Sequence, residues 1–144
     1  MTLPGPERSE LRWKQRFDNL QCAHRRLLWA LDMLQQDPES ELIRMAVIKA
    51  YEFTFELSWK TLKDFLAYNG IDAKLPREVI KQSFATGLIS DGQLWIDMLE
   101  ERNLMAHTYD DARAKAAVHL IQERYLVGLE QLHGLLSSKL EPAP

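Results

Sequence analysis

Apolar residues recur along this chain at spacings of three and four, which place side chains on one face of an α-helix. The first such stretch covers about residues 8–36, and its stripe consists of Trp13, Phe17, Leu20, His24, Leu27, Leu31 and Leu34. We expect a long amphipathic helix there. Because His24 lies on the apolar stripe, we interpret it as a hydrogen-bonded core or interface histidine rather than a ligand.

A second long helix is predicted over residues 38–68. Asp37-Pro38 is typical of a cap followed by proline at the first helical position, and Asn69-Gly70 is typical of a left-handed stop. Its apolar residues form two adjoining stripes, one of Ile43, Val47, Ala50, Leu57 and Phe65 and one of Ile48, Tyr51, Phe55, Trp59, Leu62 and Leu66. So wide an apolar surface indicates a helix with more than one neighbour, in the centre of a bundle or at a dimer interface.

The remaining face of this helix carries Lys49, Glu52, Glu56, Lys60 and Lys63. Glu52 and Glu56 admit two interpretations, a pair of catalytic carboxylates or a solvated face. We favour the solvated face, because Glu56 and Lys60 are one helical turn apart and can form an ion pair.

Three more helices complete the prediction. A short one covers 76–86, begins at Pro76 and is closed by Gly87, and the next covers 91–107 after the capping-box pattern Ser90-x-x-Gln93. The last covers 111–138 with a buried stripe of Val118, Ile121, Tyr125, Leu129, Leu132 and Leu136, while His119 and His133 fall off that stripe and are expected to be exposed. The pattern predicts an all-α fold, an antiparallel up-and-down four-helix bundle with one extra short helix.

Composition fits one domain over 1–144, with flexible ends at 1–7 and 139–144. Hydrophobic residues make up 46% and charged residues 27%, as in ordinary globular proteins. With one cysteine, Cys22, no intrachain disulfide can form, and a cytoplasmic location is expected. No signal peptide or membrane span is expected either. The net charge of −3 argues against a non-specific nucleic-acid coat protein but leaves room for a local basic site.

The candidate chemistry gathers between Arg102 and Tyr109. Trp95, Met98, Arg102, Met105 and Tyr109 form one seam of the predicted helix. A guanidinium on a buried seam needs a carboxylate, a carbonyl or an anion as its partner. The spacing of Asn103 and His107 places both on one face, so the amide can orient the imidazole.

Arg102 and His107 lie about 140° apart round an ideal helix. They can reach one ligand only if the helix ends near His107, or if two copies of the chain pool their side chains. Thr108 and the pair Asp110-Asp111 favour an ending there.

A second candidate is the basic cluster of Lys74, Arg77 and Lys81, which with Glu78 has a local charge of +3 − 1 = +2. It is a solvated face or a contact for RNA phosphates. No zinc or magnesium motif and no phosphate loop stands in the sequence, so neither a metal nor a cofactor is expected. RNA can be cut without metal, because its 2′-hydroxyl is a nucleophile. Cutting then needs a base, an acid and positive charge on the phosphorane, for which His107 and Arg102 are suitable residue types.

The pattern Arg102-Asn103-x-x-x-His107-x-Tyr109 resembles the R-x-x-x-x-H-x-Y motif of HEPN domains (higher eukaryotes and prokaryotes nucleotide-binding). The tract from Ala50 to Leu66 resembles the second helix of one branch, the nucleotidyltransferase substrate-binding subunits related to HepT toxins. Residues 76–80 and 87–91 are also similar to that branch. The resemblance covers nearly the whole chain.

The resemblance implies a homodimer in which two motifs face each other, and a minimal nucleotidyltransferase as partner protein. The apolar stripes of the first two helices, wider than one small bundle can cover, also predict a homodimer or a dimer of dimers. In the toxins the motif is a metal-independent ribonuclease site, silenced when the partner transfers AMP to the motif tyrosine. Carried over, Arg102 and His107 are catalytic, Asn103 supports them and Tyr109 accepts AMP. The alternatives are a non-catalytic substrate-binding subunit, and a Tyr109 that only caps the apolar seam. The residues themselves also favour a dimer, since one motif supplies one histidine where an acid and a base are needed.

Overall fold

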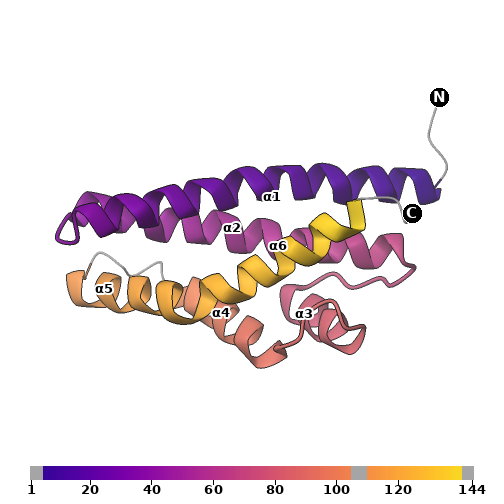
Figure 1. The fold of residues 1–144 in the computed structure, drawn as a ribbon. Helices are drawn as coiled ribbons and strands as arrows, with labels where there is room; N and C mark the ends of the chain where they lie inside the picture. Colours follow the sequence, from indigo (N-terminus) through magenta and orange to yellow (C-terminus); the bar gives the residue numbers. More distant parts are fainter. Residues whose placement is uncertain (1–4, 105–109, 141–144) are drawn as a thin grey trace.

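The computed structural model describes residues 5–104 and 110–140, and all regular structure within them is helical (Figure 1). The helices are α1 (Gly5–Gln36), α2 (Glu41–Tyr68), α3 (Pro76–Ala85), α4 (Gly92–Leu104), α5 (Asp111–Leu120), a π-helical turn η2 (Ile121–Tyr125) and α6 (Leu126–Leu140). The predicted all-α bundle with one extra short helix is confirmed, with α3 as the extra helix. Residues 5–7 and 139–140, expected to be flexible, belong to α1 and α6.

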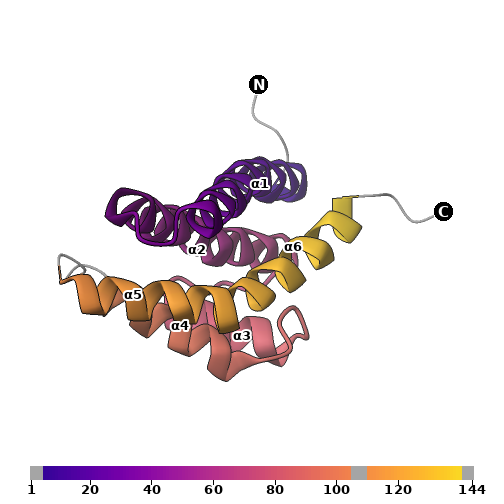
Figure 2. The ribbon, with the colours of Figure 1, turned by 60° about the vertical axis from the view of Figure 1, so that its left-hand side comes forward.

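Helices α1 and α2 form an antiparallel pair, and α3, α4 and α5 lie on the other side of α2 (Figure 2). The predicted stripe of α1 is buried except for Leu31, which is partly buried. Both predicted stripes of α2 face the core, with Ile43, Ala50 and Leu57 only partly buried. The wide apolar surface of α2 therefore makes it the central helix. None of the described helices is both long and apolar enough to cross a lipid bilayer.

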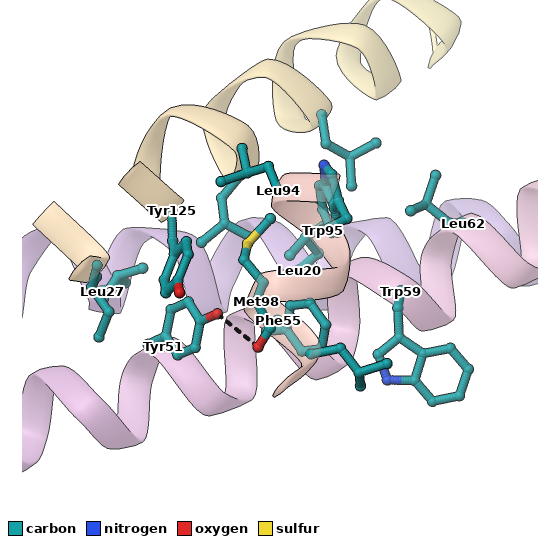
Figure 3. Packing of buried hydrophobic residues seen from close by; sticks show 14 of the residues in the cluster. Leu20, Leu27, Tyr51, Phe55, Trp59, Leu62, Leu94, Trp95, Met98 and Tyr125 are labelled. Atoms are coloured by element: carbon teal, nitrogen blue, oxygen red, sulfur yellow. Dashed lines mark hydrogen bonds between the residues drawn. The ribbon is translucent and has the colours of Figure 1, made fainter. Parts of the chain in front are cut away.

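Four polar side chains of α2 are accommodated inside this core by hydrogen bonds to backbone carbonyls. The hydroxyls of Thr54, Ser58 and Thr61 donate to the backbone carbonyls four residues earlier, at 2.7, 2.7 and 2.6 Å. The phenol of Tyr51 donates to the carbonyl of Met98 on α4 at 3.3 Å (Figure 3). Burial of these groups costs little free energy because each has its partner.

Two helix starts differ from the prediction. The amide of Ser40 donates to the carbonyl of Asp37 at 3.1 Å and closes a turn over Asp37-Pro38, so α2 begins only after it. The Ser40 hydroxyl then caps α2 by accepting from the amide of Ile43 at 3.2 Å. Asp91, not Ser90, caps α4, since its carboxylate accepts from the amide of Leu94 at 3.0 Å.

The helix ends agree with the prediction at both glycines. Gly70 follows α2 with φ 83° and Gly87 follows α3 with φ 81°. These are left-handed conformations that favour glycine.

The last predicted helix is interrupted by the π-helical turn η2, after which α6 leaves the direction of α5 (Figure 1). The buried stripe is the one predicted. The prediction that His133 is exposed is wrong. Because α6 runs obliquely towards α1, the half-buried His133 ring stacks on buried His24, with 4.9 Å between ring centres.

Candidate functional site

Arg102 lies in the last turn of α4, where its Nη1 donates to the Glu56 carboxylate of α2. Its guanidinium also lies 5.9 Å from the centre of the Phe55 ring, close enough for a cation–π contact. The partner that a guanidinium on this seam requires is therefore a carboxylate from α2. Glu56 also forms the expected ion pair with Lys60, at 3.7 Å, so the solvated-face interpretation was incomplete.

Asn103 is exposed, and its side-chain oxygen accepts from Arg102 Nη2 at 3.1 Å. The structure thus brings together the first two residues of the motif and gives the arginine two side-chain partners. His107 and Tyr109 lie outside the described residues, as does Met105.

An open hollow of about 680 Å³ lies beside Arg102, a volume in the range of small-ligand sites. It is lined by Lys49, Glu52, Phe53, Glu56, Arg102 and Asn103. Lys49 forms an ion pair with Glu52 at 3.5 Å, so the four charged lining groups balance to zero. An anion that enters the hollow must compete with Glu56 for the guanidinium.

A second arginine–carboxylate pair lies beyond the other end of the 105–109 segment. Arg44 of α2 is 4% exposed; its Nη1 donates to Asp111 at 2.9 Å and its Nη2 to the carbonyl of Pro38 at 3.2 Å. Asp110 caps α5 by accepting from the amide of Ala112 at 2.9 Å, as its type suggested. Arg102 before the 105–109 segment and Asp111 after it are thus both bonded to α2.

Glu101, next to Arg102, is a titratable group that the sequence pattern did not single out. Its side chain is half-buried, and burial raises the pKa of its carboxyl above the ordinary value. Burial also raises the pKa of the Tyr51 and Tyr125 phenols, and the charge of Glu101 adds to both shifts. No sequence motif marks Glu101, because its shift arises from packing between helices.

The basic cluster of Lys74, Arg77 and Lys81, interpreted as a solvated face or alternatively as an RNA contact, is exposed. Lys74 lies 4.0 Å from Asp72, and Arg77 lies 3.7 Å from Glu100 of α4. Glu100 and Arg102 are about 200° apart round the helix. Within one chain the cluster and Arg102 therefore face different sides of α4.

Comparison with known proteins, by sequence and by fold, finds the same group of relatives. Residues 15–138 match the family described as nucleotidyltransferase substrate binding protein like. A probable ribonuclease HepT of Haemophilus influenzae is 32% identical over 111 residues, which cover 70% of this chain and 74% of that protein. A crystal structure from Thermus thermophilus has 30% identity and a TM-score of 0.63, covering 75% of this chain and 96% of that one.

Two further solved structures share the fold. One, from Haemophilus influenzae and described as a substrate-binding domain of a nucleotidyltransferase, has 24% identity and a TM-score of 0.72 over 84% of this chain and 98% of that one. The other is a tri-AMPylated HEPN toxin of Shewanella oneidensis in complex with its MNT antitoxin, with 15% identity and a TM-score of 0.70 over 88% of this chain and 96% of that one. From the family match and the HepT relative, this chain belongs to the nucleotidyltransferase substrate-binding, HepT-like family, and it shares its fold with a HEPN toxin.

Proposed function

We propose that this chain is the ribonuclease subunit of a toxin–antitoxin pair whose other member is a minimal nucleotidyltransferase. The observation that carries the proposal is the position of Arg102. Its guanidinium opens onto a hollow of about 680 Å³, in the last turn before the segment that contains His107. The sequence identity of 32% to a probable ribonuclease also supports this proposal.

The proposed reaction is metal-independent transphosphorylation of single-stranded RNA. The 2′-oxygen attacks phosphorus and the bond to the 5′-oxygen breaks, which leaves a 2′,3′-cyclic phosphate and a 5′-hydroxyl. One His107 takes the proton of the 2′-hydroxyl, and the His107 of a second copy gives a proton to the departing 5′-oxygen. Arg102, held by Asn103, stabilises the negative charge on the phosphorane.

This chemistry requires a homodimer, for which α2 offers a surface. Leu42 and Met45 are 79% and 61% exposed and lie on either side of Arg44, which binds Asp111. A second copy that packs on Leu42 and Met45 would cover this apolar surface next to Asp111, which follows the motif in the sequence. Sedimentation should show a dimer that Leu42→Asp disrupts and Leu75→Asp, at an exposed apolar residue before α3, does not.

Tyr109 is the proposed point of control, because adenylylation of its hydroxyl would add bulk and negative charge two residues from His107. RNA would then be excluded. Co-expression with the cognate nucleotidyltransferase should add AMP to the intact mass, and Tyr109→Phe should abolish the addition. A mass increase that persists in Tyr109→Phe would contradict this mechanism.

Lys74, Arg77 and Lys81 are proposed to contact RNA outside the cleavage site, since they lie on another side of α4 from Arg102 in one chain. Their substitution should weaken RNA binding and leave the cut position unchanged.

The alternative function is a non-catalytic subunit that presents a substrate to the nucleotidyltransferase. The bond between Arg102 and Glu56 favours it, because the guanidinium is already occupied. Expression in cells separates the two. A ribonuclease should arrest growth, and His107→Ala but not His119→Ala should relieve the arrest. Equal and harmless expression of wild type and His107→Ala would favour the binding subunit.

A further inference from the structure

A second hollow lies between α1 and α2 and opens next to the one at Arg102. It has a volume of about 480 Å³ and is lined by Ala23, Arg26, Trp29, Ala30, Ala46, Lys49, Ala50, Phe53 and Leu57. Lys49 and Phe53 line both hollows, so the two are adjacent on the surface of α2. An elongated ligand could therefore extend from the groove between α1 and α2 to Arg102.

Two aromatic rings are displayed at this groove. Trp29 on α1 is 66% exposed and Phe53 on α2 is 55% exposed. Most large aromatic side chains of this protein are in the core, so two exposed rings at one groove call for a partner. Flat, exposed rings are the surfaces on which unpaired nucleic-acid bases stack.

The charges around the groove select an anionic occupant. Among the described residues that line it, Arg26 and Lys49 are charged and none is acidic; Lys49 also pairs at 3.5 Å with Glu52, which lies outside the groove. Arg26 is exposed and has no ion-pair or hydrogen-bond partner in the part of the chain that the structure describes. Lys49 lies 5.2 Å from the centre of the Phe53 ring, which places a cation beside a stacking surface. A partner with planar apolar groups and negative charge fits this combination.

We propose that the groove between α1 and α2 binds the nucleotides of single-stranded RNA that flank the phosphate at Arg102. Bases stack on Trp29 and Phe53, and phosphates contact Arg26 and Lys49. This inference rests on the proposed ribonuclease function and extends it with a binding path for the substrate. The proposed dimer face at Met45 adjoins this groove, since Met45, Ala46 and Lys49 line one hollow, and the test therefore also follows the oligomeric state.

The test uses the whole chain and a fluorescent single-stranded RNA in which every 2′-hydroxyl is methylated, so that it binds but cannot be cut. Trp29→Ala and Phe53→Ala should each weaken binding about tenfold, the size typical of one lost stacking contact. Tyr68→Ala is the control, since Tyr68 is an aromatic residue of α2 that is 39% exposed but does not line the groove, and it should leave the affinity unchanged.

Salt dependence supplies a second readout that does not depend on the aromatic variants. Arg26→Gln should reduce the slope of log K against log salt by about 0.7, the value for one phosphate contact on a single strand. Arg25→Gln, which removes a neighbouring exposed arginine outside the groove, should not change the slope.

The proposal is overturned if Trp29→Ala and Phe53→Ala bind RNA like wild type, or if they lower affinity only by dissociating the protein in sedimentation. The second result would make the groove an interface between copies. If the groove variants bind normally and wild type still cuts unmodified RNA, the groove proposal fails and the ribonuclease function stands. If wild type neither binds nor cuts RNA, both fail.

Discussion

Glu56 and Arg102 join the second and fourth helices through a carboxylate–guanidinium bond at the edge of an open hollow. Lys60 lies 3.7 Å from the other carboxylate oxygen of Glu56, so this carboxylate keeps an ion pair with Lys60 when an anion displaces it from Arg102. The arginine proposed to bind phosphate is therefore occupied by a group that can be displaced. We therefore expect this contact to control how readily Arg102 accepts an anion.

Removing the charge of Glu56 should therefore strengthen binding of RNA. Glu56→Gln keeps the size of the side chain but removes its negative charge. This charge holds the Arg102 guanidinium and repels phosphate, so we expect affinity for uncleavable RNA to rise about threefold to tenfold. Glu52→Gln is the matched control. It removes the same charge from the same hollow but frees Lys49, proposed to contact only flanking phosphates, rather than Arg102 at the cleaved phosphate, so its effect should be smaller. Equal effects would mean that Glu56 acts only through net charge.

The buried Arg44 should contribute more to stability than Lys115, the exposed cation that pairs with the same Asp111 carboxylate. Arg44→Ala removes both the bond to Asp111 and the bond to the Pro38 carbonyl, and we expect a loss of about 1–3 kcal/mol in urea unfolding, since Asp111 itself is half exposed to water. Lys115→Ala removes an exposed ion pair with the same carboxylate and should cost under about 0.5 kcal/mol. Equal losses would contradict the importance of burial.

Two glycines of α6 should respond in opposite directions to alanine. A Cβ at Gly128 would lie 2.9 Å from Leu94 Cδ2 and 3.2 Å from Met98 Cε, in the contact between α6 and α4. Gly128→Ala should destabilise by about 1 kcal/mol, because overpacking outweighs the gain in helix propensity. At Gly134 nothing lies within 4 Å, and Gly134→Ala should stabilise by about 0.5–1 kcal/mol. Thermal unfolding of both variants measures this, and stabilisation by Gly128→Ala would contradict the close approach.

The stacked His24 and His133 should make stability depend on pH. Burial and the neighbouring His133 lower the pKa of His24, while Glu130 opposes them. The folded state then binds fewer protons than the unfolded state, so stability is full above about pH 6.5 and declines as pH falls below it. The contribution of His24 to the loss of unfolding free energy has a slope of at most about 1.4 kcal/mol per pH unit. His24→Leu should remove this contribution, whereas His119→Gln, at an exposed residue, should leave the pH dependence unchanged. Parallel pH profiles for wild type and His24→Leu would rule it out.

The helices were predictable from the sequence because each buries a periodic stripe, and Trp13, Tyr51 and Leu136 lie in the core for that reason. The cap of α2 was misplaced because several residues near Pro38 can cap, and only the turn closed by Ser40 selects one. The π-helical turn left no trace in the spacing, since the stripe through Tyr125 fits an α-helix equally well.

The candidate site could be predicted only in part. Arg102 stood out because a charged residue interrupts an apolar seam, but its partner Glu56 is 46 residues away and looks like any exposed helix residue. Arg44 was overlooked in the same way, as its partner Asp111 is 67 residues away. Pairs of this kind depend on how the helices pack against each other. The hydrophobic pattern of one helix does not predict which residues of another helix it will contact.

The most direct measurement of the central claim is cleavage of unstructured RNA by the purified protein in the presence of EDTA, with the new ends identified by mass. The account predicts 2′,3′-cyclic phosphate ends from wild type and a rate lower by about 10²- to 10⁴-fold for His107→Ala. Arg102→Ala should also be inactive, and exposed His119→Ala should cut like wild type. Wild-type protein as inert as His107→Ala on every RNA, or cleavage that EDTA abolishes, would contradict it.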